Sequence, residues 1–174
     1  GTIQDHHVAL GSAAYLQSLG VDTKALQIEA DALRQDGATA ILAAFDSKPA
    51  GVIAIADPIK ASTPAVLAAL KLAGIQIVML TGDNEITAKA VAKKLGIDDV
   101  RADVQPDQKS AVVTELRLSG RIVAMAGDGV NDAPALAAAD VGIAMGTGTD
   151  VAMESAGITL LKGNLEGIIR ARQL

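Results

Sequence analysis

An apolar run that ends in a glycine-rich acidic turn constrains this 174-residue chain more than any other stretch. Residues Ile122–Ala126 predict a buried strand, and Gly127 and Gly129 let the backbone turn sharply after it. The turn carries three side chains with oxygen donors: Asp128, Asn131 and Asp132. Because open α/β sheets bind ligands at the carboxyl ends of their strands, we expect a ligand site here. The alternative is a plain strand-to-helix turn in which Asn131 or Asp132 caps the following helix.

The donors in this turn favour magnesium as the cofactor. Carboxylate and amide oxygens are the hard ligands that Mg²⁺ prefers, and the turn has no neighbouring His. The chain contains no Cys, which also excludes disulfides and CxxC metal or redox motifs. We predict Asp128 and Asp132 as metal ligands.

The composition narrows both the fold class and the range of partners. Half of the residues are hydrophobic but only 1% are aromatic, so the core must be built from Ala, Val, Ile and Leu. This composition favours alternating strands and helices over a β-sandwich. A net charge of −5 argues against nucleic acid as a partner. No apolar run approaches the roughly 18 residues that a membrane-spanning helix needs, so we expect the chain itself to be soluble.

The first third of the chain predicts a helix and a β-hairpin. Apolar positions at helical spacing place a helix over 24–35. Strands over 39–45 and 51–56, joined by a four-residue polar turn at 46–49, predict the hairpin. A hairpin in front of a regular strand–helix alternation indicates a domain boundary at Asp57–Pro58. The predicted domains are therefore residues 1–56 and residues 57–174.

Strands and helices alternate regularly after residue 57. The predicted helices span 63–72, 85–95, 107–118, 132–139 and 150–156, with a last one from 165. The predicted strands span 75–80, a short segment near 100, 122–126, 141–145 and 158–161. Helical crossovers between strands imply a mostly parallel sheet with helices on both faces, which is an α/β fold.

A second polar turn and one lysine complete the predicted site. Thr81 and Gly82 offer a hydroxyl and backbone N–H groups where a helix begins, which suits a phosphoryl group, and Asp83 follows them. Lys109 can place a cation against phosphoryl oxygens. With magnesium, these are the parts of a phosphoryl-transfer site. The plainer alternatives are a helix cap for Thr81 and a solvated surface lysine for Lys109.

The sequence offers no clear nucleophile for covalent phosphoryl transfer. Asp57 ends a strand but precedes Pro58 and Ile59, and Asp46 lies in the predicted hairpin turn. There is no GxxxxGK[ST] phosphate loop, and Gly146-Thr147-Gly148 is only a partial dinucleotide pattern.

The motifs resemble those of P-type ATPases, whose phosphorylation domain belongs to the haloacid-dehalogenase-like superfamily. The strings that carry the resemblance are Gly127–Pro134, Thr81-Gly82-Asp83, Asp57-Pro58 and Pro106–Lys109. The segment 146–156 is similar to the heavy-metal class of these ATPases. The overlapping sequence Glu-Ser-Ala-Gly-Ile-Thr-Leu, residues 154–160, is more similar to copper(I) or silver exporters than to zinc and cadmium pumps. The resemblance covers nearly the whole chain, with residues 1–56 similar to the closing part of the nucleotide-binding domain.

The resemblance implies a role for each site residue. Asp128 would bind the catalytic Mg²⁺, and Thr81 and Lys109 would contact an aspartyl phosphate. Asp83, next to Gly82, would help close the site on nucleotide and metal. Asn131 and Asp132 would hold the phosphate site together. Asp57 would lie at the hinge between the two domains.

The resemblance also implies a larger protein around this chain. The family's phosphorylated Asp, in Asp-Lys-Thr-Gly-Thr, is absent, so the aspartyl phosphate would form outside these residues. ATP would be the substrate, and copper(I) or silver(I) would pass through a membrane domain that is also absent. The parent would lie in the cell membrane with this segment on its cytoplasmic side, and this chain alone would be inactive. Two alternatives are a stand-alone Mg²⁺-dependent haloacid-dehalogenase-like phosphatase and a nucleotide- or phosphate-binding module without catalysis.

Overall fold

The structure, a computed structural model of the chain, describes residues 1–127, 130–146, 154, 156–160 and 165–172. The chain forms two compact units. The first comprises Gly1–Pro58 and Asp83–Ala102, and the second comprises Ile59–Gly82 and Asp103–Leu174. Residues 83–102 thus group with the N-terminal part. The division into functional domains at residues 56 and 57 stays a prediction.

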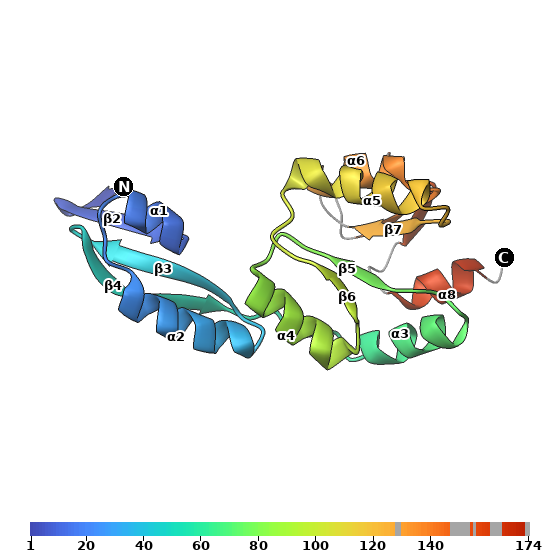
Figure 1. Cartoon of the computed structure of the whole chain (residues 1–174), viewed down its shortest axis with the longest axis horizontal. Helices are drawn as coiled ribbons and strands as arrows, with labels where there is room; N and C mark the ends of the chain where they lie inside the picture. The colour runs from blue at the N-terminus through green and yellow to red at the C-terminus, as the bar shows by residue number, and fades with distance from the viewer. Residues whose placement is uncertain (128–129, 147–153, 155, 161–164, 173–174) are drawn as a thin grey trace. The chain divides into compact units, whose positions relative to one another are not determined.

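The first unit is built on a four-stranded antiparallel sheet with the strand order β1-β2-β3-β4 (Figure 1). Its strands are β1 (Thr2–Ile3), β2 (His6–Gly11), β3 (Thr39–Phe45) and β4 (Lys48–Ile55). The expected hairpin is therefore present, but its turn is shorter than predicted. Only Asp46 and Ser47 connect β3 to β4, with φ values of 48° and 60°. Two consecutive positive φ angles match the right-handed twist of the flanking strands, which is why a two-residue turn replaces the predicted four-residue one.

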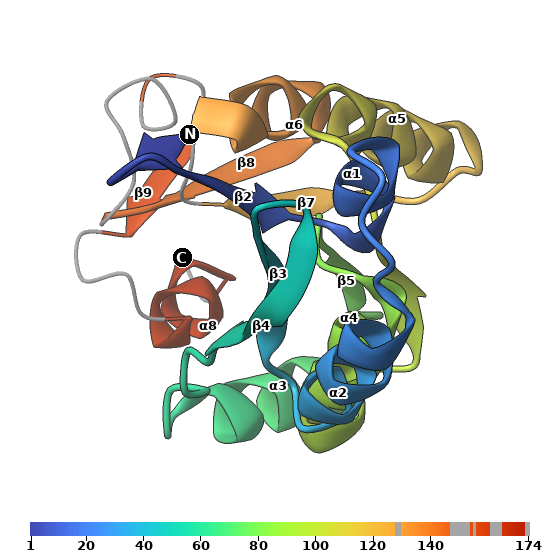
Figure 2. The ribbon, with the colours of Figure 1, turned by 90° about the vertical axis from the view of Figure 1, so that its left-hand side faces the viewer.

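Three helices belong to the first unit: α1 (Ala13–Ser18), α2 (Lys24–Gln35) and α4 (Glu85–Leu95). Strand β6 (Asp99–Arg101) follows α4. Helix α2 packs against β3, β4 and α4, as the ribbon in Figure 2 illustrates for α2 and α4. Alternate residues of β3 point into the core. The core cluster consists of Leu16, Val21, Leu26, Ala30, Ala40, Leu42 and Ala44.

The second unit contains a parallel sheet in the order β7-β8-β9. The strands of this sheet are β7 (Ala124–Gly127), β8 (Val141–Met145) and β9 (Ile158–Leu160), and the unit also contains strand β5 (Val78–Leu80) outside it. Within its described residues, the α-helices are α3 (Thr63–Leu72), α5 (Lys109–Leu118), α6 (Ala133–Ala138) and α8 (Glu166–Arg172). Two short 3₁₀ turns, η1 (Pro106–Gln108) and η2 (Val130–Asp132), precede α5 and α6. In Figures 1 and 2, α5 and α6 lie side by side over β7 and β8, and both helices contact each other.

Several elements have the bounds that the sequence predicts. Helices 24–35, 63–72 and 85–95 and strand 141–145 have the predicted bounds. Strand 122–126 is shifted to 124–127, and the helices predicted over 107–118 and 132–139 each begin with a 3₁₀ turn instead. The predicted helix 150–156 lies largely outside the described residues.

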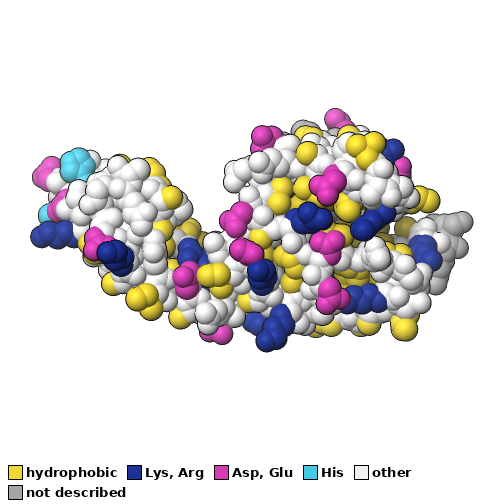
Figure 3. Space-filling model, viewed as in Figure 1, with side chains coloured by type: hydrophobic (Ala, Val, Ile, Leu, Met, Phe, Trp, Pro, Cys, Tyr) yellow, Lys and Arg dark blue, Asp and Glu magenta, His cyan; other side chains and the backbone are white. Residues whose placement is uncertain are grey.

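Aliphatic side chains reach the surface of the second unit as well as filling its core. Buried residues include Val66, Leu67, Leu70, Val113, Leu136 and Ile143. Leu72, Leu118 and Ile122 are almost fully exposed, and Figure 3 shows hydrophobic side chains among charged ones on one face of this unit. None of the helices in the described ranges combines the length and apolarity that crossing a bilayer requires.

Candidate active site

Lys109 and Asp132 form an ion pair at the carboxyl end of β7. The Lys109 Nζ atom donates to Asp132 Oδ1 at 2.7 Å. Only 17% of the lysine side chain and 11% of the aspartate side chain are exposed. An ion pair this far from water is costly to form and costly to break, because each charge depends on the other for compensation. The structure thus brings together two residues that the sequence had placed in one site.

The turn before α5 fixes where Lys109 lies. Gln105 and Gln108 form a capping box, in which Gln108 Oε1 accepts a hydrogen bond from the Gln105 N–H at 3.1 Å. Pro106 occupies the first position of η1, where the missing N–H costs nothing. Helix α5 begins at Lys109, directly after this turn. The helix dipole disfavours a positive charge at a helix N-terminus. The Asp132 carboxylate offsets that repulsion.

Asp132 is the residue before α6, yet its side chain makes no capping hydrogen bond. The alternative in which Asp132 caps this helix is therefore not met, because its carboxylate faces Lys109 and Gly127 instead. A Cβ placed on Gly127 would lie 2.7 Å from Asp132 Cβ and 2.8 Å from its Oδ2. Gly127 is the last residue of β7, and the missing side chain makes room for the carboxylate. The sequence predicted a sharp backbone turn at Gly127, and the structure shows that this glycine also allows close packing of the Asp132 side chain.

Thr81 and Gly82 lie next to the segment that leads into η1. The Val104 N–H donates to the Thr81 carbonyl oxygen at 3.1 Å, and a Cβ on Gly82 would lie 3.4 Å from the Val104 carbonyl oxygen. This contact links the end of β5 to the chain that carries Lys109. Thr81 does not cap α4. Asn84 holds that position, and its Oδ1 accepts from the Ile86 N–H at 2.9 Å.

The other predicted site residues are placed less directly. Asp83 belongs to the first unit, where its Oδ1 accepts a hydrogen bond from Thr39 Oγ1 at 3.2 Å. Asn131 is exposed within η2, and Asp57 is exposed after β4. Asp128 lies outside the described residues. The roles expected for these four residues stay predictions.

The carboxylate oxygens of the candidate site are the type of ligand that magnesium prefers. Within the described ranges, no three His, Cys, Asp or Glu side chains gather as a metal site. Mg²⁺ is usually held by only one or two carboxylates together with waters and substrate phosphates. The Asp132 carboxylate, largely buried beside Gly127 and Lys109, fits such a site if Asp128 adds the second carboxylate. Both ligands stay predictions.

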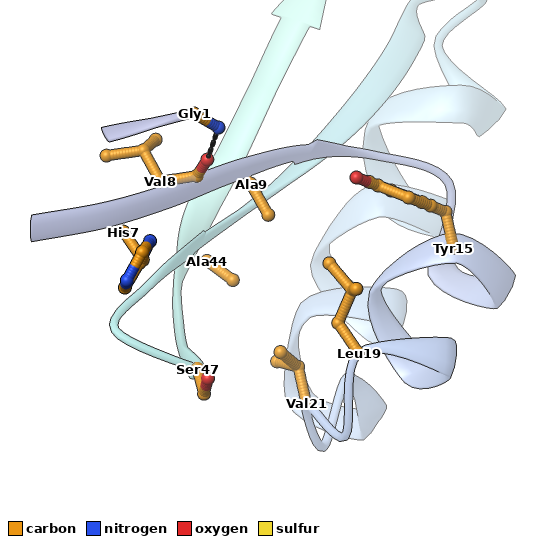
Figure 4. A pocket seen from close by; sticks show the side chains of 9 residues that line it. All are labelled: Gly1, His7, Val8, Ala9, Tyr15, Leu19, Val21, Ala44 and Ser47. Atoms are coloured by element: carbon orange, nitrogen blue, oxygen red, sulfur yellow. Dashed lines mark hydrogen bonds between the residues drawn. The ribbon is translucent and has the colours of Figure 1, made fainter. Parts of the chain in front are cut away.

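The first unit contains a separate cavity of about 270 Å³ (Figure 4). Its lining consists of Gly1, His7, Val8, Ala9, Tyr15, Leu19, Val21, Ala44 and Ser47. The Gly1 amine donates to the Val8 carbonyl oxygen at 2.8 Å beside it. The lining includes no residue that the sequence predicted for the site. The cavity is thus a feature of the N-terminal unit, distinct from the Lys109–Asp132 pair.

Comparison with known proteins identifies the family of this fold and site. Residues 3–140 match the family described as haloacid dehalogenase-like hydrolase. The expected α/β fold of that superfamily is confirmed by this match and by the solved structures below.

The curated relatives are metal-transporting P-type ATPases. A copper-transporting P-type ATPase of Rhizobium leguminosarum bv. viciae is 64% identical over 96% of this chain and 20% of the relative. A silver exporting P-type ATPase of Salmonella typhimurium is 59% identical over 100% of this chain and 21% of the relative. This chain therefore spans about a fifth of the length of these relatives, and the resemblance to the copper and silver class is confirmed.

The solved structures that share the fold include two ATPases. A zinc-transporting PIB-type ATPase in the E2.Pi state matches 99% of this chain and 27% of its own, with a TM-score of 0.69 and 33% identity. The catalytic domain of the CPx-ATPase CopB-B, studied for its changes upon nucleotide binding, matches 77% of this chain and 53% of its own, with a TM-score of 0.64 and 31% identity.

Proposed function

Because the chain belongs to the haloacid dehalogenase-like hydrolase family, we propose that it is the ATP-hydrolysing part of a copper- or silver-transporting P-type ATPase. The largely buried Lys109–Asp132 pair, at the carboxyl end of β7, carries this proposal. The identity to copper and silver P-type ATPases across nearly all of the chain supports it. Residues 57–174 would form the phosphorylation domain, and residues 1–56 the end of the nucleotide-binding domain.

The chemistry of the pair suits phosphoryl transfer. A lysine ammonium that is held away from water interacts more strongly with phosphoryl oxygens than a solvated one does. Asp132 keeps the ammonium at a fixed position before the phosphoryl group arrives. Thr81 and the Gly82 backbone, which the Val104 contact ties to the start of η1, would supply further hydrogen bonds. Mg²⁺, bound by Asp128 and Asp132, would neutralise charge on the phosphoryl oxygens.

The remaining roles follow from the family. Asn131 would help hold the phosphate site, Asp83 would close it on nucleotide, and Asp57 would be a hinge. The carboxylate that accepts the phosphoryl group would lie outside these residues. The whole pump would sit in a membrane with this part on the cytoplasmic side and would move copper(I) or silver(I).

A chimeric pump tests this function. This chain replaces the matching segment of the Rhizobium leguminosarum relative, and the chimera is incubated with γ-labelled ATP, Mg²⁺ and copper(I). We expect copper-stimulated ATP hydrolysis and an acid-stable protein label that hydroxylamine removes, as an acyl phosphate requires. Lys109→Met abolishes the label, whereas Lys89→Met retains it, because Lys89 pairs with Glu85 on the exposed face of α4. A folded chimera without hydroxylamine-labile label would contradict the proposal.

A further inference from the structure

An ion pair between Arg117 and Asp140 joins the C-terminal end of α5 to the segment that follows the C-terminus of α6. Arg117 Nε donates to Asp140 Oδ1 at 2.9 Å, and a second guanidinium nitrogen of Arg117 lies 2.9 Å from the same oxygen. Its remaining terminal nitrogen donates to the Ala138 carbonyl oxygen at 2.8 Å. A guanidinium that uses three nitrogens on one short segment fixes both position and orientation.

Asp140 connects this arginine to the sheet. Its Oδ2 accepts a hydrogen bond from the Val123 N–H at 2.9 Å. The Asp140 and Val141 N–H groups both donate to the Val123 carbonyl oxygen, at 3.0 and 3.1 Å. The Val123 N–H, followed by the Arg117 guanidinium, holds the pKa of the Asp140 carboxyl below its ordinary value, although partial burial opposes this. Arg117 is thus tied to the starts of β7 and β8 through one carboxylate.

The two ion pairs have matching spacing. Lys109 and Arg117 are eight residues apart on α5, and Asp132 and Asp140 are eight residues apart on either side of α6. Eight helical residues span about 12 Å, so the pairs lie near opposite ends of the α5–α6 contact. Helix α6 is itself pressed onto β8, since a Cβ on Gly142 would lie 2.7 Å from the Leu136 carbonyl oxygen. With α6 seated on the sheet, two attachments leave α5 little freedom to slide or rotate.

We propose that Arg117 and Asp140 are positioning residues that hold α5 in the register at which Lys109 meets Asp132. The importance of that register for catalysis rests on the proposed function. Exposed ion pairs alone contribute little to stability, and 45% of Arg117 and 32% of Asp140 are exposed. The main role of the Arg117–Asp140 pair is therefore to position Lys109. A measurement of stability alone would not detect this role.

Carbon-13 NMR of the reductively methylated chain reads the Lys109 environment directly. The Lys109 methyl signal is assigned by its loss in Lys109→Arg, and its shift without the ion pair is taken from Asp132→Asn. We expect Arg117→Ala and Asp140→Asn to move the signal at least halfway toward the Asp132→Asn position. Arg117→Lys, which keeps the charge but loses the fork, moves it less. Arg121→Ala removes an exposed arginine near the end of α5 and leaves the signal in place.

Thermal unfolding of the same samples separates positioning from stability. Asp140→Asn keeps an oxygen acceptor for the Val123 N–H, so it is expected to stay folded even if Arg117→Ala does not. A lower melting temperature with the Lys109 signal of the folded protein still at its wild-type position would overturn the proposal. The signal needs neither ATP nor phosphate, so its result stands apart from the chimeric pump. In a chimera that forms phosphoenzyme, Arg117→Ala should lower kcat several-fold with KM for ATP unchanged.

Discussion

Helices α4 and α5 each carry a lysine paired with a carboxylate, but the two pairs lie in very different surroundings. On α4, Lys89 Nζ lies 2.6 Å from Glu85 Oε1, four residues earlier, with 67% and 62% of the side chains exposed. On α5, Lys109 pairs with Asp132, 23 residues later, and both side chains are largely buried. The lengths of the two contacts are nearly equal, so distance does not distinguish them.

The comparison shows that sequence separation and burial together distinguish an ion pair on the surface from one in a candidate active site. An i, i+4 pair forms within one helix and remains in water, where screening weakens it. A pair between a helix start and a distant turn forms only when the fold is complete, and it withdraws both charges from water. We therefore expect changes at Lys109 and Asp132 to be large, and matched changes on α4 to be small.

The largest effect is expected from Asp132→Ala. Removing the carboxylate leaves the Lys109 ammonium partly buried without its partner, which should lower the free energy of unfolding by about 3 kcal/mol. Urea denaturation measures the change. Adding Lys109→Met to the same chain should recover most of the loss, because no buried charge then remains. Equal stability of the single and double variants would contradict this account, because the unpaired Lys109 ammonium would then carry no cost.

Gly127→Ala should have the next largest effect. The added methyl would meet Asp132 Cβ at 2.7 Å, and the strain should cost about 1–3 kcal/mol and displace the carboxylate from Lys109. Gly51→Ala is the matched control, since it lies in a strand with nothing within 4 Å of its added Cβ. That variant should be stabilised by about 0.4–1 kcal/mol through the unfolded chain. Equal responses of the two variants in urea would refute the close packing at Gly127.

Acid should weaken the contact between α5 and β7 through Asp140. A carboxyl whose pKa is lowered on folding contributes stability above its ordinary pKa, here 3.8, and loses it as the pH falls through the folded value. The urea midpoint of the wild-type chain should therefore decline below about pH 4. Asp140→Asn should decline less steeply over that range, since it has no proton to gain. Parallel curves for the two proteins would contradict a lowered Asp140 pKa.

The smallest effect is expected from Glu85→Gln on α4. The Lys89 ammonium and hydrogen bond hold the Glu85 pKa below its ordinary value, but both groups are solvated. The variant should leave the melting temperature unchanged within error at physiological salt. A decrease in melting temperature as large as that caused by Asp132→Ala would contradict the expected difference between the exposed pair on α4 and the buried pair on α5.

Local signals predicted most helices, but long-range contacts decided the site. Asn84 and Gly96 delimit α4 where the sequence placed it, because a cap and a left-handed glycine act within one turn. The 3₁₀ starts of α5 and α6 were missed, since periodicity does not distinguish them from a first helical turn. Lys109 and Asp132 were each predicted as site residues, but their pairing depends on how η1 and η2 pack. No sequence pattern showed that Gly127 serves the Asp132 carboxylate, or that Arg117 reaches Asp140.

The binding of inorganic phosphate to this chain in the presence of Mg²⁺ tests most directly whether the buried pair forms a phosphoryl site. Isothermal titration of the wild-type chain should give saturable, Mg²⁺-dependent binding that Lys109→Met abolishes and Lys89→Met leaves intact. Binding of equal strength by Lys109→Met and the wild-type chain, or no binding by a folded wild-type chain, would contradict a phosphate site at Lys109 and Asp132.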